Sequence, residues 1–171
     1  MQLHPFIHNS FKCTFKTFFS TYIPHIKGSI PKYSLNSPVL LKVGDFMEYS
    51  RSYTHEDLDK FADLTGDINP IHIMKTNSNN EQIKTIVHGI LTGSMFSTLF
   101  GYQIPGTIYL KQNLLFQNIL YTDEVVTAKV MVTRIFYDKH ICVVSTECIR
   151  DYDKKKIIDG TAYIKIDNLI S

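Results

Sequence analysis

Asp67 and His72 are the two residues of this chain whose types and spacing best suit acid–base chemistry. Their free side chains have pKa values of roughly 3.9 and 6.5, so both can exchange protons near neutral pH. Pro70 lies between them, fixes its own φ and disfavours helical geometry at the preceding residue, Asn69. We therefore expect residues 67–72 to form a stiff, extended excursion rather than a helical continuation, with both side chains aimed at one point.

A short helix is predicted over residues 54–64, directly before this excursion. Thr54 is a candidate N-cap, Asp57 takes the place of the usual glutamate of a capping box, and apolar residues follow with helical spacing. Gly66 is suited to the C-cap. Asp67 should therefore emerge where the helix ends and be anchored from behind.

A second helix is predicted to begin at Gly89 and to run to about Phe100, because the stretch is apolar and Gly101 and Pro105 follow it. A helix N-terminus presents unpaired N–H groups and about half a positive charge, which suits a developing oxyanion. Glycine there lets a carbonyl group approach the backbone closely. Ser97 lies two turns later on roughly the same face, although a helix serine can also simply bond to a carbonyl of the preceding turn.

Two linked motifs carry a family resemblance. Residues 64–72 read LTGDINPIH, and VHGIL follows at 87–91, with Ser97 eight residues past the glycine of that second motif. In this order they resemble the MaoC-like hydratase/dehydratase family, with the closest likeness to its mitochondrial hydroxyacyl-thioester dehydratases of type 2, over roughly residues 40 to 165. The resemblance implies a hotdog fold, a homodimer, and interconversion of (R)-3-hydroxyacyl and trans-2-enoyl thioesters.

The resemblance also implies roles for individual residues. Asp67 and His72 would move the C2 proton and protonate the departing C3 hydroxyl, and the order in which they share these tasks stays open. The N–H of Gly89 would polarise the thioester carbonyl. Ser97 and Asn69 would support the geometry of the pair. No metal and no redox cofactor is expected.

Two other functions remain open beside the dehydratase. The same fold could carry a thioesterase or a non-catalytic acyl-thioester-binding subunit, because fold alone does not establish activity. The pair of Asp67 and His72 favours an enzyme over a binding subunit. The sequence has no nucleophile beside a base, no glycine-rich phosphate loop and no histidine–cysteine spacing typical of a zinc site. His88 can bond to the backbone and is given no proton-transfer role.

The remaining elements predict an α+β protein with a single hotdog fold, a curved antiparallel sheet around one central buried helix, over residues 38–168. The stretch 86–110 has no charged residue, but its glycines and Pro105 favour a buried helix over a membrane span. Residues 73–85 are polar and predict a loop or frayed helix. Segments rich in Val, Ile, Thr and Tyr predict strands at 39–41, 46–53, 107–116, 124–137, 140–149 and 157–166.

The chain has 171 residues and a net charge of +2, which suits one domain with a tail and gives no reason to expect a nucleic-acid partner. Residues 1–37 are basic, hydroxyl-rich and free of acidic residues, so we expect a mitochondrial transit peptide, or else a disordered extension. The expected location is the mitochondrial matrix, and the expected partner is an acyl group on acyl carrier protein or on coenzyme A. Cys142 and Cys148 lie six residues apart in a predicted strand and should be core thiols.

Overall fold

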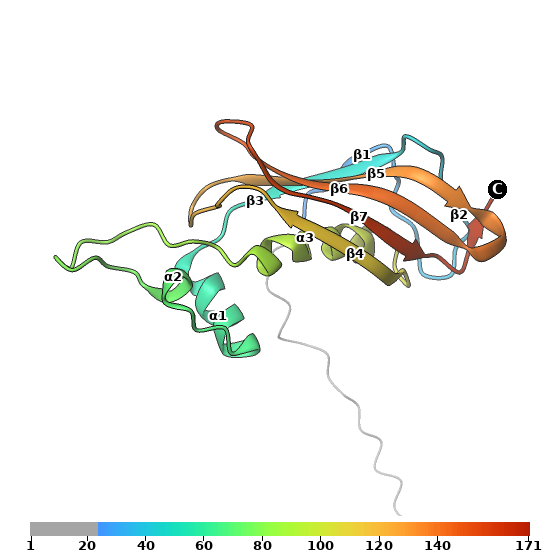
Figure 1. The fold of residues 1–171 in the computed structure, drawn as a ribbon. Helices are drawn as coiled ribbons and strands as arrows, with labels where there is room; N and C mark the ends of the chain where they lie inside the picture. Colours follow the sequence, from blue (N-terminus) through green and yellow to red (C-terminus); the bar gives the residue numbers. More distant parts are fainter. Residues whose placement is uncertain (1–23) are drawn as a thin grey trace, which may run out of the picture.

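The structure, a computed structural model, describes residues 24–171. A six-stranded antiparallel sheet, in the order β1-β3-β5-β6-β7-β4, curves over the helix α3 (Figure 1). This arrangement is the predicted hotdog fold. The strands are β1 (Lys27–Gly28), β2 (Val39–Leu40), β3 (Phe46–Arg51), β4 (Ile108–Phe116), β5 (Val126–Phe136), β6 (Ile141–Arg150), β7 (Lys156–Lys165) and β8 (Leu169–Ile170), and the helices are α1 (His55–Thr65), α2 (Pro70–Ile73), α3 (Gly89–Gln103) and the 3₁₀ turn η1 (Tyr137–Lys139).

The sheet follows the period-two alternation of its strands. In β5, Val126, Ala128, Val130 and Val132 are buried against the core, and most of the intervening side chains lie on the outer face. The long strands predicted from the sequence are therefore confirmed, with boundaries that differ by one or two residues. Each pair of neighbouring strands between β3 and the edge strand β4 keeps a continuous antiparallel register over most of its length. A bulge interrupts the register in the pairs β5–β6, β6–β7 and β4–β7.

The uncharged stretch of the sequence forms α3 and is the centre of the core. Met95, Phe96, Leu99 and Phe100 are all fully buried where α3 packs on the sheet. The prediction of a buried central helix is therefore confirmed. Among the residues described, no helix has the length and hydrophobicity that crossing a membrane requires.

The N-terminal boundary expected at residue 38 does not coincide with the start of the described fold. β1 pairs with β3, and Ile30 is buried in the core. The Nε2 amide of Gln103 donates to the carbonyl of Ile30 at 2.7 Å, and the N–H of Tyr33 donates to the carbonyl of Gln103 at 2.8 Å. Residues 27–33 thus pack on the end of α3. The rest of the expected transit peptide or extension, residues 1–23, lies outside the described residues.

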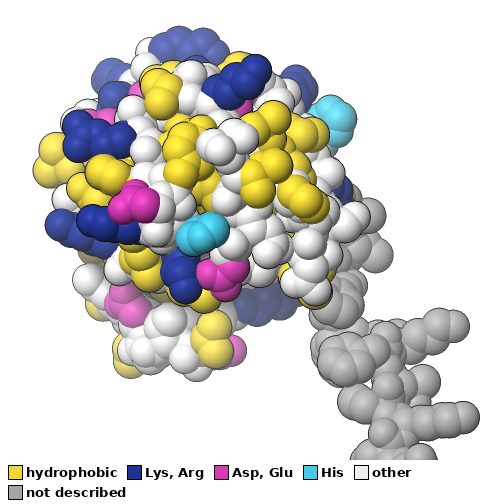
Figure 2. Space-filling model, turned by 90° about the vertical axis from the view of Figure 1, so that its right-hand side faces the viewer, with side chains coloured by type: hydrophobic (Ala, Val, Ile, Leu, Met, Phe, Trp, Pro, Cys, Tyr) yellow, Lys and Arg dark blue, Asp and Glu magenta, His cyan; other side chains and the backbone are white. Residues whose placement is uncertain are grey.

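The C-terminal boundary also extends past residue 168, because β8 pairs with β2 in a separate two-stranded parallel sheet. Figure 2 shows the end of the molecule that carries these two strands, where hydrophobic side chains gather on the surface among lysines and arginines. Leu40 and Ile170 are exposed there. The strand predicted at 39–41 is β2, whereas β8 has too few residues to show a periodic pattern in the sequence.

Cys142 and Cys148 lie on β6 and are fully buried free thiols, as predicted. Burial raises the pKa of the Cys142 thiol to about 12 and raises the pKa of the Cys148 thiol as well. Cys13 lies outside the described residues.

Candidate active site

Asp67 is placed by the end of α1. The N–H of Asp57 donates to Oγ1 of Thr54, and the N–H of Thr54 donates to Oδ2 of Asp57, so the predicted capping box is confirmed. Gly66 adopts the left-handed conformation, with φ 78°, and its N–H donates to the carbonyl of Ala62 at 2.7 Å. Asp67 follows at once, with a side chain that is 48% exposed.

His72 is placed by α2, and the extended excursion expected here is wrong. Asn69 is non-helical, as its position before a proline requires, but Pro70 then begins a one-turn helix. Proline suits the first position of a helix because it has no N–H to leave unpaired. The side chain of Asn69 accepts from the N–H of Ile71 at 3.4 Å, so the supporting residue expected at position 69 is the cap of α2.

The ring of His72 is fixed from the opposite side by the main chain. Its Nδ1 lies 2.8 Å from the carbonyl oxygen of Ile86, which can only accept a hydrogen bond. Nδ1 therefore carries the proton in the neutral ring, and Nε2 is the nitrogen with a free lone pair. A carbonyl oxygen is common to every residue type, so the role of Ile86 had no signal in the sequence.

Gly89 is the first residue of α3, as predicted. The first intrahelical bond runs from the N–H of Thr92 to the carbonyl of His88, so the N–H groups of the preceding turn have no acceptor within the helix. His88 is the N-cap, but its side chain does not bond to these groups. A Cβ at position 89 would come within 2.6 Å of Cε1 of Phe116, so the ring of Phe116 covers this glycine.

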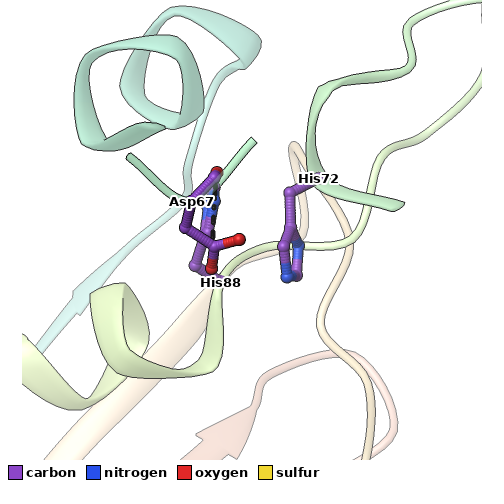
Figure 3. A group of neighbouring side chains, drawn as sticks. All are labelled: Asp67, His72 and His88. Atoms are coloured by element: carbon purple, nitrogen blue, oxygen red, sulfur yellow. Dashed lines mark hydrogen bonds and ion pairs between the residues drawn. The ribbon is translucent and has the colours of Figure 1, made fainter. Parts of the chain in front are cut away.

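Asp67, His72 and His88 come together from three separate segments (Figure 3). One carboxylate oxygen and one ring nitrogen from each histidine lie within 4.8 Å of one another. The rings of His72 and His88 are stacked, with centroids 4.0 Å apart and planes at 25°. Nε2 of His88 lies 3.2 Å from the main-chain oxygen of Asp67 and 3.9 Å from its Oδ2. The expected bond between His88 and the backbone is thus confirmed.

These residue types could also hold a metal ion, but their hydrogen bonds fit a proton-transfer site better. Nε2 of His88 donates to the main-chain oxygen of Asp67 and therefore offers no lone pair to a metal ion, whereas Nε2 of His72 keeps its lone pair. Burial, and the positive charge that His72 carries when protonated, lower the pKa of His88 against the opposing effect of Asp67.

Two cavities meet at this cluster. One of about 200 Å³ is lined by Asp67, His72, His88 and Gly89, together with residues of α1. The other, of about 260 Å³, shares His72, Gly89 and Ile90 with the first and continues along β4 and β7. Its apolar walls include Val87, Phe116, Ile119, Leu120 and Ile157.

Ser97 is not brought into the cluster within this chain. Its side chain is exposed, lines neither cavity, and donates to the carbonyl of Ser94 at 2.8 Å. The structure thus agrees with the alternative that Ser97 is an ordinary helix serine bonded to its own helix.

A curved sheet around a buried helix defines a hotdog-fold protein, and in this one an aspartate, a histidine and a helix N-terminus lie around one pair of cavities. Residues 44–151 match the family model described as MaoC like domain, and the chain belongs to this family.

Named relatives include a mitochondrial 3-hydroxyacyl-[acyl-carrier-protein] dehydratase from Arabidopsis thaliana, 32% identical over 139 residues, which are 80% of this chain and 84% of that protein. An (R)-specific enoyl-CoA hydratase from Aeromonas caviae is 37% identical over 129 residues, 74% of this chain and 96% of that protein. A solved structure of an (R)-hydratase from A. caviae superposes with a TM-score of 0.66 at 33% identity, and covers 74% of this chain and 97% of the other.

Proposed function

We propose that this protein is a hydro-lyase that reversibly dehydrates (R)-3-hydroxyacyl thioesters to trans-2-enoyl thioesters. The observation that carries the proposal is the convergence of His72, Asp67 and the N-terminal residue of α3, Gly89, on one pair of connected cavities. An acid–base pair and an oxyanion site are the two requirements for elimination next to a thioester carbonyl. The names of the dehydratase and hydratase relatives support the same reaction.

In the dehydration direction, the thioester carbonyl would accept a hydrogen bond from the N–H of Gly89 at the start of α3. This contact acidifies the C2 proton and stabilises the enolate, and one such donor typically contributes roughly 3–4 kcal/mol. The C2–H electrons then form the C2–C3 double bond, and the C3–O bond breaks. Asp67 and His72 together accept the C2 proton and give a proton to the leaving hydroxyl, which departs as water.

The neutral His72 is suited to both halves of this exchange. Its Nδ1–H is bonded to the carbonyl of Ile86, so its Nε2 accepts a proton and can return it without a change in ring orientation. The acyl chain would lie in the apolar cavity beyond Gly89, between α3 and the ends of β4 and β7. Hydrophobic walls at this place favour a hydrocarbon chain over a polar substituent.

The proposed setting is fatty acid synthesis in the mitochondrial matrix, with acyl carrier protein as the carrier. The mitochondrial dehydratases of Arabidopsis thaliana and Solanum lycopersicum support this setting. Coenzyme A is the other possible carrier, because the bacterial relatives are named for enoyl-CoA. Rates with matched acyl groups on the two carriers decide between them.

We also propose that the protein acts as a homodimer. β4 is an edge strand of the described sheet, and its side chains Ile108, Leu110, Leu115 and Phe116 are exposed in a single chain. An exposed apolar edge strand of this kind usually marks a protein–protein interface, and a second copy of this chain would bury it. Light scattering coupled to gel filtration should give twice the mass of one chain, and a monomer at micromolar concentration would contradict this proposal.

The test of the activity is the loss of ultraviolet absorbance when a trans-2-enoyl thioester is hydrated. We expect Asp67→Asn and His72→Ala each to lower kcat by about 10²–10⁴-fold, because each removes a proton-transfer group. The matched controls Asp63→Asn and His55→Ala make the same chemical changes on α1, outside the cluster of Asp67, His72 and His88, and should leave kcat near that of the parent. Near-normal turnover in both site variants would refute the mechanism, and release of free thiol without hydration would indicate a thioesterase.

A further inference from the structure

His88 contacts both members of the acid–base pair and also adjoins the oxyanion site. It is only 2% exposed. Its Nε2 lies 3.2 Å from the main-chain oxygen of Asp67, its ring stacks on that of His72, and its own carbonyl accepts the first hydrogen bond of α3. Gly89 is its immediate neighbour in the chain. A shift of His88 would therefore displace all three components of the site at once.

The hydrogen bond to Asp67 fixes the protonation pattern of the ring. A carbonyl oxygen only accepts, so Nε2 of His88 carries the proton. The other nitrogen, Nδ1, is buried and has no hydrogen-bond partner in the described part of the chain. A second proton on Nδ1 would leave a charged donor buried without an acceptor, which is strongly unfavourable.

The groups around the ring of His88 also disfavour, on balance, a positive charge on it. The titratable groups that act on it are Asp67 and His72, and α1 packs the uncharged ring of Phe61 against it, with ring centroids 4.8 Å apart. Asp67 favours a charge on His88, but burial and a protonated His72 disfavour it. The geometry therefore leaves proton exchange to His72, which lines both cavities and whose Nε2 has a free lone pair.

We propose that His88 is a positioning residue that stays neutral through turnover and holds Asp67 and His72 in register with Gly89. Nε2–H fixes the main chain at Asp67, and the ring face fixes the plane of His72. This inference rests on the proposed dehydratase function for its kinetic consequences, but the protonation state that it assigns is a property of the resting protein.

The kinetic test uses two substitutions that separate the donor from the ring. His88→Phe keeps an aromatic face and removes the donor, whereas His88→Gln keeps an amide donor near the position of Nε2 and removes the ring. We expect His88→Phe to lower kcat by about tenfold to a hundredfold with little change in KM, because the reacting groups are misaligned after the substrate has bound. His88→Gln should recover at least part of this loss. Parent-like kcat in a folded His88→Phe variant would overturn the proposal. A rise in KM by the same factor as the fall in kcat would also overturn it, because substrate binding would then be impaired as much as turnover.

The second test does not depend on activity and uses the parent protein. Nuclear magnetic resonance of ¹⁵N-labelled histidine distinguishes the two neutral tautomers from the charged ring. His88 should keep the Nε2–H pattern from about pH 5.5 to pH 8, across the usual histidine pKa of about 6.5. Titration of His88 within this range, or a proton on Nδ1, would overturn the proposal even if both variants misfold. An inactive parent in which His88 stays neutral would instead refute the proposed function alone.

Discussion

Gly89 is the residue at which the proposed oxyanion site and the packing of the sheet meet. Its position at the start of α3 leaves an N–H free to bind a carbonyl oxygen, and the ring of Phe116 from β4 covers its Cα. From the sequence, the glycine at position 89 is explained by the need for a substrate carbonyl to approach the backbone closely. The structure adds a second reason, because a side chain at this position would collide with Phe116.

We expect Gly89→Ala to lower kcat/KM by about tenfold or more, because a carbonyl misplaced by about 1 Å loses most of its stabilisation. The new Cβ would lie 2.6 Å from Cε1 of Phe116. The double variant Gly89→Ala/Phe116→Ala tells the two causes apart. Recovery of activity would assign the loss to the displaced ring, and no recovery would assign it to crowding at the carbonyl. Unchanged kinetics in Gly89→Ala would contradict the oxyanion role.

The lowered pKa of His88 makes the stability of the protein depend on pH. In the unfolded chain His88 takes up a proton below about pH 6.5, whereas in the folded chain it does so only at lower pH. The unfolded state then binds more protons, so the free energy of unfolding falls as the pH falls below about 6.5, by at most about 1.4 kcal/mol per pH unit for this one group. Urea unfolding at pH 7.5 and pH 5.5 measures the difference. His88→Gln should show a smaller difference, and an equal one would contradict the assignment.

At the scale of elements, the site depends on one end of each of three helices. α1 ends at Gly66 so that Asp67 leaves the helix, α2 begins at Pro70 so that His72 faces Ile86, and α3 begins at Gly89. Gly66 and Asn69 specify the first two of these ends locally, whereas His88 gives the start of α3 no side-chain cap. The distances between the three ends depend on long-range contacts, because they are set by how α1 and α2 dock against α3.

The capping box of α1 offers a measurement at this scale. Thr54→Ala should lower the free energy of unfolding by about 1 kcal/mol, because the N–H of Asp57 loses its acceptor at the helix start. For a domain of this size, the midpoint of thermal unfolding should fall by about 2–4 °C per kcal/mol. Thr54→Ser keeps the hydroxyl and is the matched control. Equal unfolding temperatures for the alanine and serine variants would contradict the capping role.

The elements with strong local signals were predictable, and those that depend on single contacts were not. Thr54, Asp57 and Gly66 specify α1 by their side-chain and backbone chemistry, and the uncharged stretch specifies α3. α2 was missed because Pro70 was interpreted only as a helix breaker, although proline also begins helices. β1 and β8 have two residues each and carry no periodic signal. The Asp67–His72 motif located the pair, but its hydrogen bonds to Ile86 and His88 required the folded chain.

For the whole molecule, the segment that precedes the predicted domain is part of its core. Ile30 is buried, and residues 27–33 pack on the end of α3, where Ile30 and Tyr33 form hydrogen bonds with Gln103. If the chain carries the expected transit peptide, we predict that its removal occurs before β1, so that the mature protein keeps this segment. A cut near residue 38 would expose the end of the central helix.

Two truncated chains test this expectation. A chain that begins at Pro24 should unfold at the temperature of the full-length protein. A chain that begins at Pro38 should be less stable by roughly 1.5–3 kcal/mol for the lost burial of Ile30 alone. It also leaves the amide of Gln103 without its acceptor. Equal stability of the two chains in urea would show that residues 24–37 only rest on the surface.

The buried thiols of β6 make one decisive assay simple to interpret. Thioesterase and dehydratase activities are told apart by the release of free thiol from the substrate, which coloured disulfide reagents detect by reacting with thiolates. Cys142 and Cys148 are shielded from solvent, and their raised pKa values keep them protonated at neutral pH. A chain that begins at Pro24 also lacks Cys13. Any colour that develops with the folded protein then measures cleavage of the thioester, with no background from the enzyme itself.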